Sequence, residues 1–333
     1  NKMVPSRHAT KCYPRSWYPI ARSSELKGGQ HQAIRAFSAD WILFRGISGE
    51  AGFLRRHCPH MGADLVQGGV CENSIECPLH GWRFSRMGVC DHIPALKTSL
   101  PHIETNSLPC YESYGIIFVF WGENPEYELP LPPQMEGDLI CSHVHTIELE
   151  TEHHTPCLNT FDLQHFERIH NRRFVERPKI FSQYGVHLQI EYKAAIIKRR
   201  WSDYIMAWIG PSNTRVVIDC WGSSLLMLYN RDTKIGGMVA MLPIEHNQSR
   251  VFILAAKEEH GKRSIIRGFL DQITVGLGAF LMKGFLQPDL SALTNMQPYD
   301  GKLIDGLDDA AQLSWDYWQQ LPRWAGPLTP QGD

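Results

Sequence analysis

Two short stretches decide the fold: RRHCPHMGADL at residues 55–65 and ECPLHGW at residues 76–82. Each contains one cysteine and one histidine around a proline, in the patterns Cys-x-His and Cys-x-x-His. Thiolates and imidazoles are both metal ligands, so the two stretches together offer four ligands to one metal centre. The four residues are Cys58, His60, Cys77 and His80.

Three interpretations compete for these ligands. A structural zinc site uses the same residue types, but zinc motifs usually pair Cys with Cys and His with His. A Rieske [2Fe–2S] centre carries two cysteines on one iron and two histidines on the other, which explains why each stretch supplies one of each. Buried cysteines with incidental histidines would need two coincidences of spacing. We therefore predict the Rieske centre, with Gly62 and Gly81 letting the backbone approach the cluster and His57 outside the motif.

Composition restricts the class of protein. The chain has 333 residues, enough for two domains, and a formal net charge of −2 that gives no general attraction to nucleic acid. Nine cysteines, an odd number, favour free thiols and metal ligands in a reducing compartment, so we expect a cytoplasmic protein. The longest apolar run, ITVGLGAFLMKGFL at 273–286, is interrupted by Lys283 and three glycines, and predicts no membrane span or membrane partner. The first 17 residues contain no apolar signal region.

The composition and the apolar pattern of the sequence change along the chain, and this change predicts an α+β protein. Residues 1–122 combine an N-terminal arm with short strands such as AIRAF, WILFR and AGFLR, as in a small all-β Rieske domain. Residues 123–138, rich in proline and acid, predict a linker. Residues 139–333 predict a catalytic domain, in which a curved antiparallel sheet surrounds a long helix and encloses a pocket.

The elements expected in this second domain follow from apolar periodicity. Strands are predicted for HVHTIELE, VHLQIEYKAAII, DYIMAWI, RVVIDCW, SLLMLY, GMVAMLP and RVFILAA. Helices are predicted at 159–173, at 261–286 with Pro288 ending the helix, and at 308–321.

The segment NTFDLQHFERIHNRRF at 159–174 contains a second group of metal-ligating residues. On a helix, Asp162 and His165 lie about 60° apart, so the carboxylate of Asp162 can bond His165. His165 and His170 would be about 140° apart, too wide for one metal, so a shared metal requires an irregular helix. Two histidines and one carboxylate form the facial triad of non-haem Fe(II) oxygenases. The candidates for the carboxylate are Asp271, Asp289 and Asp300.

The order CxH, CxxH and N-x-x-D-x-x-H-x-x-x-x-H resembles the Rieske non-haem iron oxygenases over nearly the whole chain. The resemblance implies a mononuclear Fe(II) with O2 as co-substrate and points to Asp289, because QPDLSALTNMQ at 287–297 matches the family's third-ligand segment. Pro288 departs from the pattern, since an acid is common there. The resemblance also gives functional roles to Asn159 and Asp162. Asp162 would link His165 to the cluster ligand His80 of a neighbouring protomer in a homotrimer.

The activity implied by this resemblance is that of a monooxygenase that hydroxylates a small natural product. Electrons would come from an NAD(P)H-dependent reductase or a ferredoxin, because GLGAFL at 276–281 lacks the third glycine of a dinucleotide motif. The two motif segments look most similar to saxitoxin-tailoring hydroxylases, whose guanidinium substrate would need carboxylates such as Asp219, Asp232 or Asp271. The alternatives are an O- or N-demethylase, a steroid hydroxylase, or an electron carrier or ligand-binding protein without active mononuclear iron.

Four further histidines cluster in the sequence but match no motif. We assign them to strand and loop positions. They are His143, His145, His153 and His154.

Overall fold

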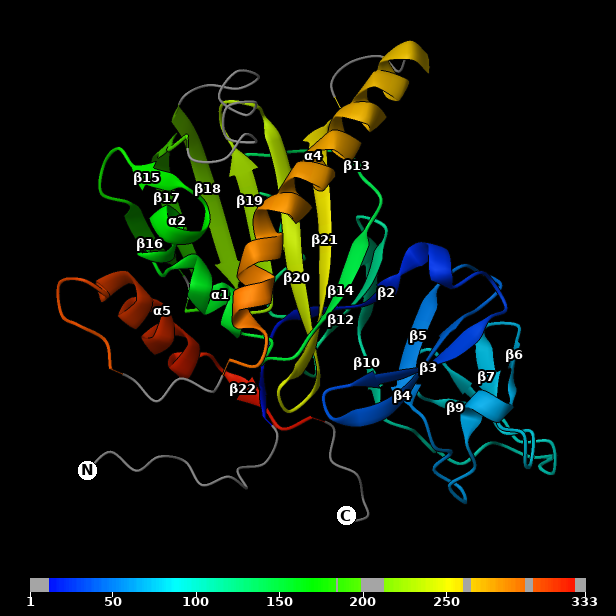
Figure 1. The fold of residues 1–333 in the computed structure, drawn as a ribbon. Coiled ribbons are helices and arrows are strands. Elements are labelled where there is room, and N and C mark those ends of the chain that lie inside the picture. The colour runs from blue at the N-terminus through cyan, green and yellow to red at the C-terminus, as the bar shows by residue number, and fades with distance from the viewer. Residues whose placement is uncertain (1–11, 184, 199–212, 260–264, 297–301, 327–333) are drawn as a thin grey trace. The chain divides into compact units, whose positions relative to one another are not determined.

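The computed structural model describes residues 12–183, 185–198, 213–259, 265–296 and 302–326. The chain divides into two compact units, one formed by residues 1–128 together with 322–333, the other by residues 129–321. The division falls inside the predicted linker 123–138, which contains no helix or strand. Figure 1 shows the two units and their elements.

The first unit is built from strands, as predicted for an all-β domain. Its sheets have the orders β10-β5-β4-β3, β11-β12-β2, β6-β7-β8-β9 and β1-β22. Their bounds are β1 Tyr13–Pro14, β2 Trp17–Arg22, β3 His31–Ala36, β4 Ala39–Arg45, β5 Ala51–Arg55, β6 Gly69–Cys71, β7 Ser74–Glu76, β8 Arg83–Ser85, β9 Cys90–His92, β10 Ser107–Leu108, β11 Cys110–Ser113, β12 Ile116–Phe120 and β22 Arg323–Trp324, with short 3-10 helices at Ser23–Glu25 and Leu65–Gln67.

The end of the chain returns to this first unit, which the sequence did not indicate. Strand β22 pairs antiparallel with β1, and the indole of Trp121 donates to the carbonyl of Trp324 at 2.9 Å. These contacts join segments from opposite ends of the sequence into one unit.

The second unit confirms the predicted antiparallel sheet with one long helix. The sheet has the order β13-β21-β20-β19-β18-β17-β15, with β14 beside β21 and β16 beside β17. The bounds are β13 Leu139–Cys141, β14 His145–Leu149, α1 Thr155–Thr160, α2 His165–Ile169, β15 Arg172–Phe174, β16 Lys179–Gln183, β17 His187–Ile196, β18 Asn213–Trp221, β19 Leu225–Asn230, β20 Ile235–Glu245, β21 Gln248–Glu258, α4 Ile265–Leu293 and α5 Asp309–Gln320. The predicted strand DYIMAWI falls outside the described residues.

Helix α4 lies across the sheet and packs on β21, β20 and β13 (Figure 1). Gly237 in β20 permits this approach, because a Cβ at that position would overlap the side chain of Met282. The helix continues to Leu293, so the prediction that Pro288 ends it is wrong. Proline removes one intrahelical bond, to the carbonyl four residues earlier, and that residue is the exposed Gly284, where water can take the free carbonyl.

By length and composition alone, the part of α4 from Gly268 to Leu293 could also cross a membrane. Val275 and Ala279, however, are completely buried or nearly so, and two acids, Asp271 and Asp289, are buried on the same helix. Packing on the sheet accounts for only part of this apolar composition, because 17% of the apolar window is buried and large side chains such as Phe269, Leu277 and Phe280 are exposed.

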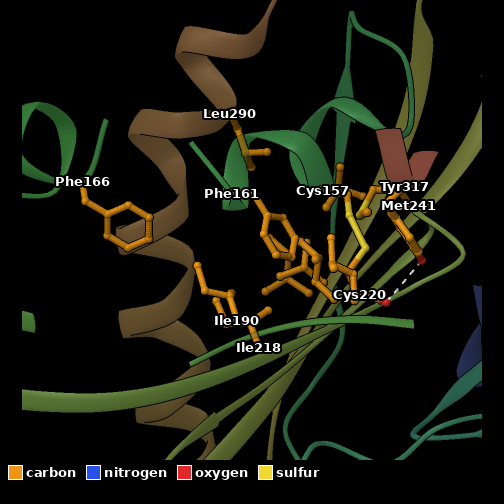
Figure 2. Packing of buried hydrophobic residues seen from close by; sticks show 14 of the residues in the cluster. Cys157, Phe161, Phe166, Ile190, Ile218, Cys220, Met241, Leu290 and Tyr317 are labelled. Carbon is orange, nitrogen blue, oxygen red and sulfur yellow. Dashed lines mark hydrogen bonds between the residues drawn. A yellow bond between two sulfur atoms is a disulfide. The ribbon is translucent and has the colours of Figure 1, made fainter. Parts of the chain in front are cut away.

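A disulfide bond joins Cys157 of α1 to Cys220 of β18 (Figure 2). The expectation of free thiols is therefore wrong for this pair, which is 63 residues apart in sequence and meets only when the sheet folds. Beside it, the hydroxyl of Tyr317 in α5 donates to the carbonyl of Val186 at 2.6 Å. The bond fixes α1 to the sheet immediately before the segment that carries His165 and His170.

Candidate active site

The two Cys–His loops of the first unit repeat one backbone turn. The N–H of Cys58 donates to the carbonyl of Ala63 at 2.8 Å, and the N–H of Gly62 donates to the carbonyl of Cys58 at 2.9 Å. In the second loop, Cys77 donates to the carbonyl of Trp82 at 2.8 Å and Gly81 donates to the carbonyl of Cys77 at 3.0 Å. Both glycines have positive φ, 76° and 68°, a conformation that glycine adopts without strain.

The cysteine and histidine side chains on these turns differ in burial. Cys58 and Cys77 are 3% and 2% exposed and belong to the apolar core of the unit, whereas His60 and His80 are exposed. The two imidazole rings lie 4.8 Å apart, and the His60 ring stacks on Trp82 at 4.1 Å. The loops thus present two inner sulfurs and two outer imidazoles.

The protonation of the buried thiols also fits a cluster site. Burial raises the pKa of Cys58 to about 11, and the hydrogen bond and charge of the adjacent Cys77 add to this effect. Two neighbouring thiolates in the core would be costly without a cation, and bound iron supplies that cation. The donor set and its burial therefore fit a [2Fe–2S] group with cysteines on the inner iron and histidines on the outer iron.

In the second unit, one ligand atom from each of His165, His170 and Asp289 lies within 4.8 Å of the others. The Nε2 of His170 is 2.9 Å from one carboxylate oxygen of Asp289, and the Nε2 of His165 is 3.9 Å from the other. The three side chains are at most 10% exposed. Three buried ligand atoms, two from histidines and one from an aspartate, thus lie close together in a 2-His-1-carboxylate arrangement.

The backbone of the histidine segment is irregular, as a shared metal requires. The predicted continuous helix at 159–173 is wrong: α1 ends at Thr160, α2 runs only from His165 to Ile169, and His170 follows its last turn. Asn171 then adopts a left-handed φ of 53°, which directs the chain into β15. Ending α2 before His170 brings the two imidazoles to a ring separation of 5.1 Å.

The orientation of His165 is set by the main chain of Asp162. The Nδ1–H of His165 donates to the carbonyl of Asp162 at 2.5 Å, while the nearest carboxylate oxygen is 3.8 Å away. Burial lowers the pKa of His165, and the charge of Asp289 opposes this effect. With Nδ1 protonated, the lone pair of Nε2 faces Asp289 and is available to a metal.

The carboxylate of Asp162 accepts the N–H of Gln164 at 2.9 Å and remains 40% exposed. The predicted carboxylate–imidazole bond is thus replaced by a bond to the carbonyl of the same residue. The carboxylate keeps acceptor capacity for a group outside this unit.

Of the other carboxylates predicted as third ligand, Asp271 bonds Lys257 at 2.6 Å on another part of α4. Asp300 lies outside the described residues. The sequence reasoning missed Phe285, whose ring stacks on His170 at 3.9 Å and 11°. Its signal was the spacing, because a residue four positions before Asp289 shares its helix face.

A cavity of about 60 Å³ adjoins the triad. Its lining is mostly aliphatic and aromatic, and includes Phe166, Ile218, Leu226, Leu228, Val239, Phe285, Leu286 and Leu290. The polar lining groups besides the triad are Asn159, Thr160 and Tyr192. Within the described part of the chain, the lining has no charged side chain other than the triad itself.

Known proteins match the first unit and about half of the chain. Residues 16–112 match the family model of the Rieske [2Fe-2S] domain. Chlorophyllide a oxygenase, chloroplastic, of Oryza sativa subsp. japonica is 35% identical over 163 residues, 48% of this chain and 29% of the relative. Cholesterol 7-desaturase nvd 1 of Ciona intestinalis is 32% identical over 183 residues, 52% of this chain and 38% of the relative. These matches show a Rieske [2Fe-2S] domain at residues 16–112 and a similarity of about half of the chain to these relatives.

The fold is also similar to that of a known structure. The terminal oxygenase of carbazole 1,9a-dioxygenase from Novosphingobium sp. KA1 superimposes with a TM-score of 0.70 at 17% identity, covering 94% of this chain and 93% of that chain. At this identity the likeness shows a shared fold alone. The matched regions span less than half the length of the two curated relatives.

Proposed function

We propose that this chain is a Rieske non-haem iron monooxygenase that hydroxylates a C–H bond of a small organic molecule. The observation that carries the proposal is the buried triad of His165, His170 and Asp289 beside an apolar cavity, in a chain that also has a Rieske domain. An electron carrier would need the Rieske domain, and a ligand-binding protein would need the cavity. Neither of them would need the triad.

The residues of the chain prepare both sites for their metals. When bound, the mononuclear iron would activate O2 with electrons supplied through the cluster, so that one oxygen atom enters the substrate and the other leaves as water. His165 stays neutral because it is buried, and its Nδ1 proton is held by the carbonyl of Asp162. Phe285 fixes the plane of the His170 ring. The apolar lining excludes water from the reacting carbon.

The electron path belongs to the same proposal. The exposed carboxylate of Asp162 would accept a hydrogen bond from His80 of a second copy, which is itself exposed. This contact would connect one cluster with the triad of a neighbour, as in the proposed homotrimer. A separate NAD(P)H-dependent reductase or ferredoxin would supply the electrons, in the cytoplasm.

The cavity supports a neutral, largely apolar reacting part of the substrate. A saxitoxin-type guanidinium would need a carboxylate, but the three candidates bond elsewhere: Asp219 accepts from Gln189 at 2.6 Å, Asp232 accepts the backbone N–H of Arg215 at 2.7 Å, and Asp271 accepts from Lys257. None of them lines the cavity. An uncharged, apolar reacting group such as an alicyclic carbon matches this lining better, and O- or N-demethylation and steroid hydroxylation are the alternatives within the same chemistry.

Iron analysis and single turnover test the function. The oxygenase is expected to hold about three irons per chain, two in the cluster and one at the triad. Protein reduced without oxygen and then exposed to O2 and one neutral candidate substrate should give a product with one oxygen atom from O2, detected by mass spectrometry with ¹⁸O2. Two irons per chain, with a Rieske EPR signal and no triad iron, would establish the electron-carrier alternative instead.

A further inference from the structure

The turn before α1 gathers another group of metal-ligating side chains, separate from the triad. One ligand atom from each of Glu152, His153 and His154 lies within 4.8 Å of the others, the same limit that the triad meets. We propose that this turn is a second metal site of the unit, which holds a divalent cation of the Zn²⁺ type with two imidazoles and one carboxylate.

The backbone presents these three successive side chains to a common point. The N–H of Thr155 donates to the carbonyl of Glu152 at 3.0 Å and closes the turn. The residue before the turn is also anchored, because the hydroxyl of Ser249 in β21 donates to the carbonyl of Thr151 at 3.0 Å. Since both ends of the turn are held, little chain entropy is lost when a cation binds.

The two imidazoles are buried and oriented. His153 is 4% exposed and His154 is 9% exposed, and their rings lie 5.6 Å apart at 81°. The His154 ring stacks on Trp318 of α5 at 4.0 Å and 17°, which limits its rotation. Fixed imidazoles are the donors that Zn²⁺ and its neighbours in the transition series prefer.

The carboxylate is held by neighbours that are not part of the triad. Its Oε1 lies 2.7 Å from the Nδ1 of His246 and 3.4 Å from the backbone N–H of Asn247. The side chain of His246 is 80% exposed, so it can turn away without cost to the core. Hydrogen bonds to the ligating carboxylate orient it, as they do in known metal sites.

Space for a further ligand lies next to this group. Glu152 and His154 both line a cavity of about 230 Å³ bounded also by Leu158, Leu293 and Trp315. Three protein ligands with a fourth position open to a cavity form the donor pattern of zinc sites that bind water or a small ligand. The proposed site would therefore fix the start of α1 and keep one exchangeable position.

The test is zinc binding by the full chain with its cluster intact. All measurements start from the variant Asp289→Ala, called the background variant. It lacks the carboxylate of the triad, so zinc bound at the triad does not contribute to the measured zinc. This variant is expected to bind one Zn²⁺ per chain, with an X-ray absorption spectrum showing nitrogen and oxygen neighbours, including two imidazoles, and no sulfur. Adding Glu152→Gln or His154→Ala should raise the Kd for Zn²⁺ by roughly 100-fold or more.

The control is His102→Ala, which removes an exposed histidine of the first unit and should leave the Kd unchanged. The Rieske EPR signal and the thermal midpoint of each variant verify folding. The proposal would be overturned by sulfur neighbours in the spectrum or by the absence of zinc from the Asp289→Ala variant. It would also be overturned if adding Glu152→Gln or His154→Ala to that variant left the Kd for Zn²⁺ unchanged.

Discussion

The cluster loops and the iron triad bring their ligands together by different routes. In the first unit, two short loops close the same turn through their own backbone, and each loop contributes one sulfur and one imidazole. In the second unit, two histidines around one short helix meet an aspartate near the end of α4, and only the packing of α4 on the sheet unites them. One site depends on local conformation, the other on tertiary structure, so they should respond differently to the same kind of damage.

The largest effect is expected from removing one ligand in each unit. Cys77→Ser should lose the two cluster irons and the Rieske EPR signal but keep the triad iron. Asp289→Ala should lose the triad iron and keep that signal. Product formation should fall to background in both variants. Iron analysis and EPR check the pattern, and loss of both signals from one exchange would show that the sites are not independent.

Removal of the disulfide should affect the second unit, which contains the triad, and not the cluster loops of the first unit. Exchange of both Cys157 and Cys220 for alanine frees a loop of 63 residues and should lower the free energy of unfolding by about 4 kcal/mol. Equilibrium denaturation of the second unit measures the change, with Cys141→Ala, a free cysteine of the same unit, as the control. Equal stability of the double variant and the control would contradict the expectation.

Asp162→Asn distinguishes the two roles of that residue. The carbonyl that orients His165 is unchanged, so both metals should remain, while turnover should slow roughly 10- to 100-fold because the exposed carboxylate is lost. Metal content and the rate of product formation are the measurements. Full turnover in this variant would exclude the proposed path through Asp162.

The glycines of the cluster loops offer a finer test of local conformation. Gly62→Ala should cost about 1–2 kcal/mol because φ is positive there and the space around it is open. Gly81→Ala should cost more, because its Cβ would also lie 2.9 Å from Pro94. The temperature at which the visible absorbance of the cluster disappears ranks the two variants. A lower temperature for Gly62→Ala than for Gly81→Ala would contradict the argument.

The smallest effect concerns pH. Burial lowers the pKa of His165 below its ordinary value of 6.5, so the unfolded chain binds a proton more readily than the folded one. The stabilising contribution of the neutral imidazole is fully present above about pH 6.5 and decreases as the pH falls toward the folded pKa. Denaturation of metal-free protein should show this decline, and His165→Ala should show a weaker one.

Much of this arrangement was predictable from sequence because it rests on local pattern. The spacing of Cys58, His60, Cys77 and His80 predicts the Rieske domain, and period-two apolar runs predict the strands of the large sheet. The continuous helix at 159–173 was wrong, since helical periodicity reveals neither the break between Thr160 and His165 nor the left-handed Asn171 that turns the chain after α2. The Cys157–Cys220 bond could not be predicted, because no local pattern records which strand faces α1.

The repeated turn of the cluster loops has a consequence for protein engineering. Each loop closes through its own backbone bonds, the first between β5 and the 3-10 helix Leu65–Gln67 and the second between β7 and β8. Two such loops grafted onto another small β scaffold, with a buried contact for each sulfur, would carry the complete ligand set with them. The motif is therefore a portable module for installing a high-potential redox centre in a designed protein.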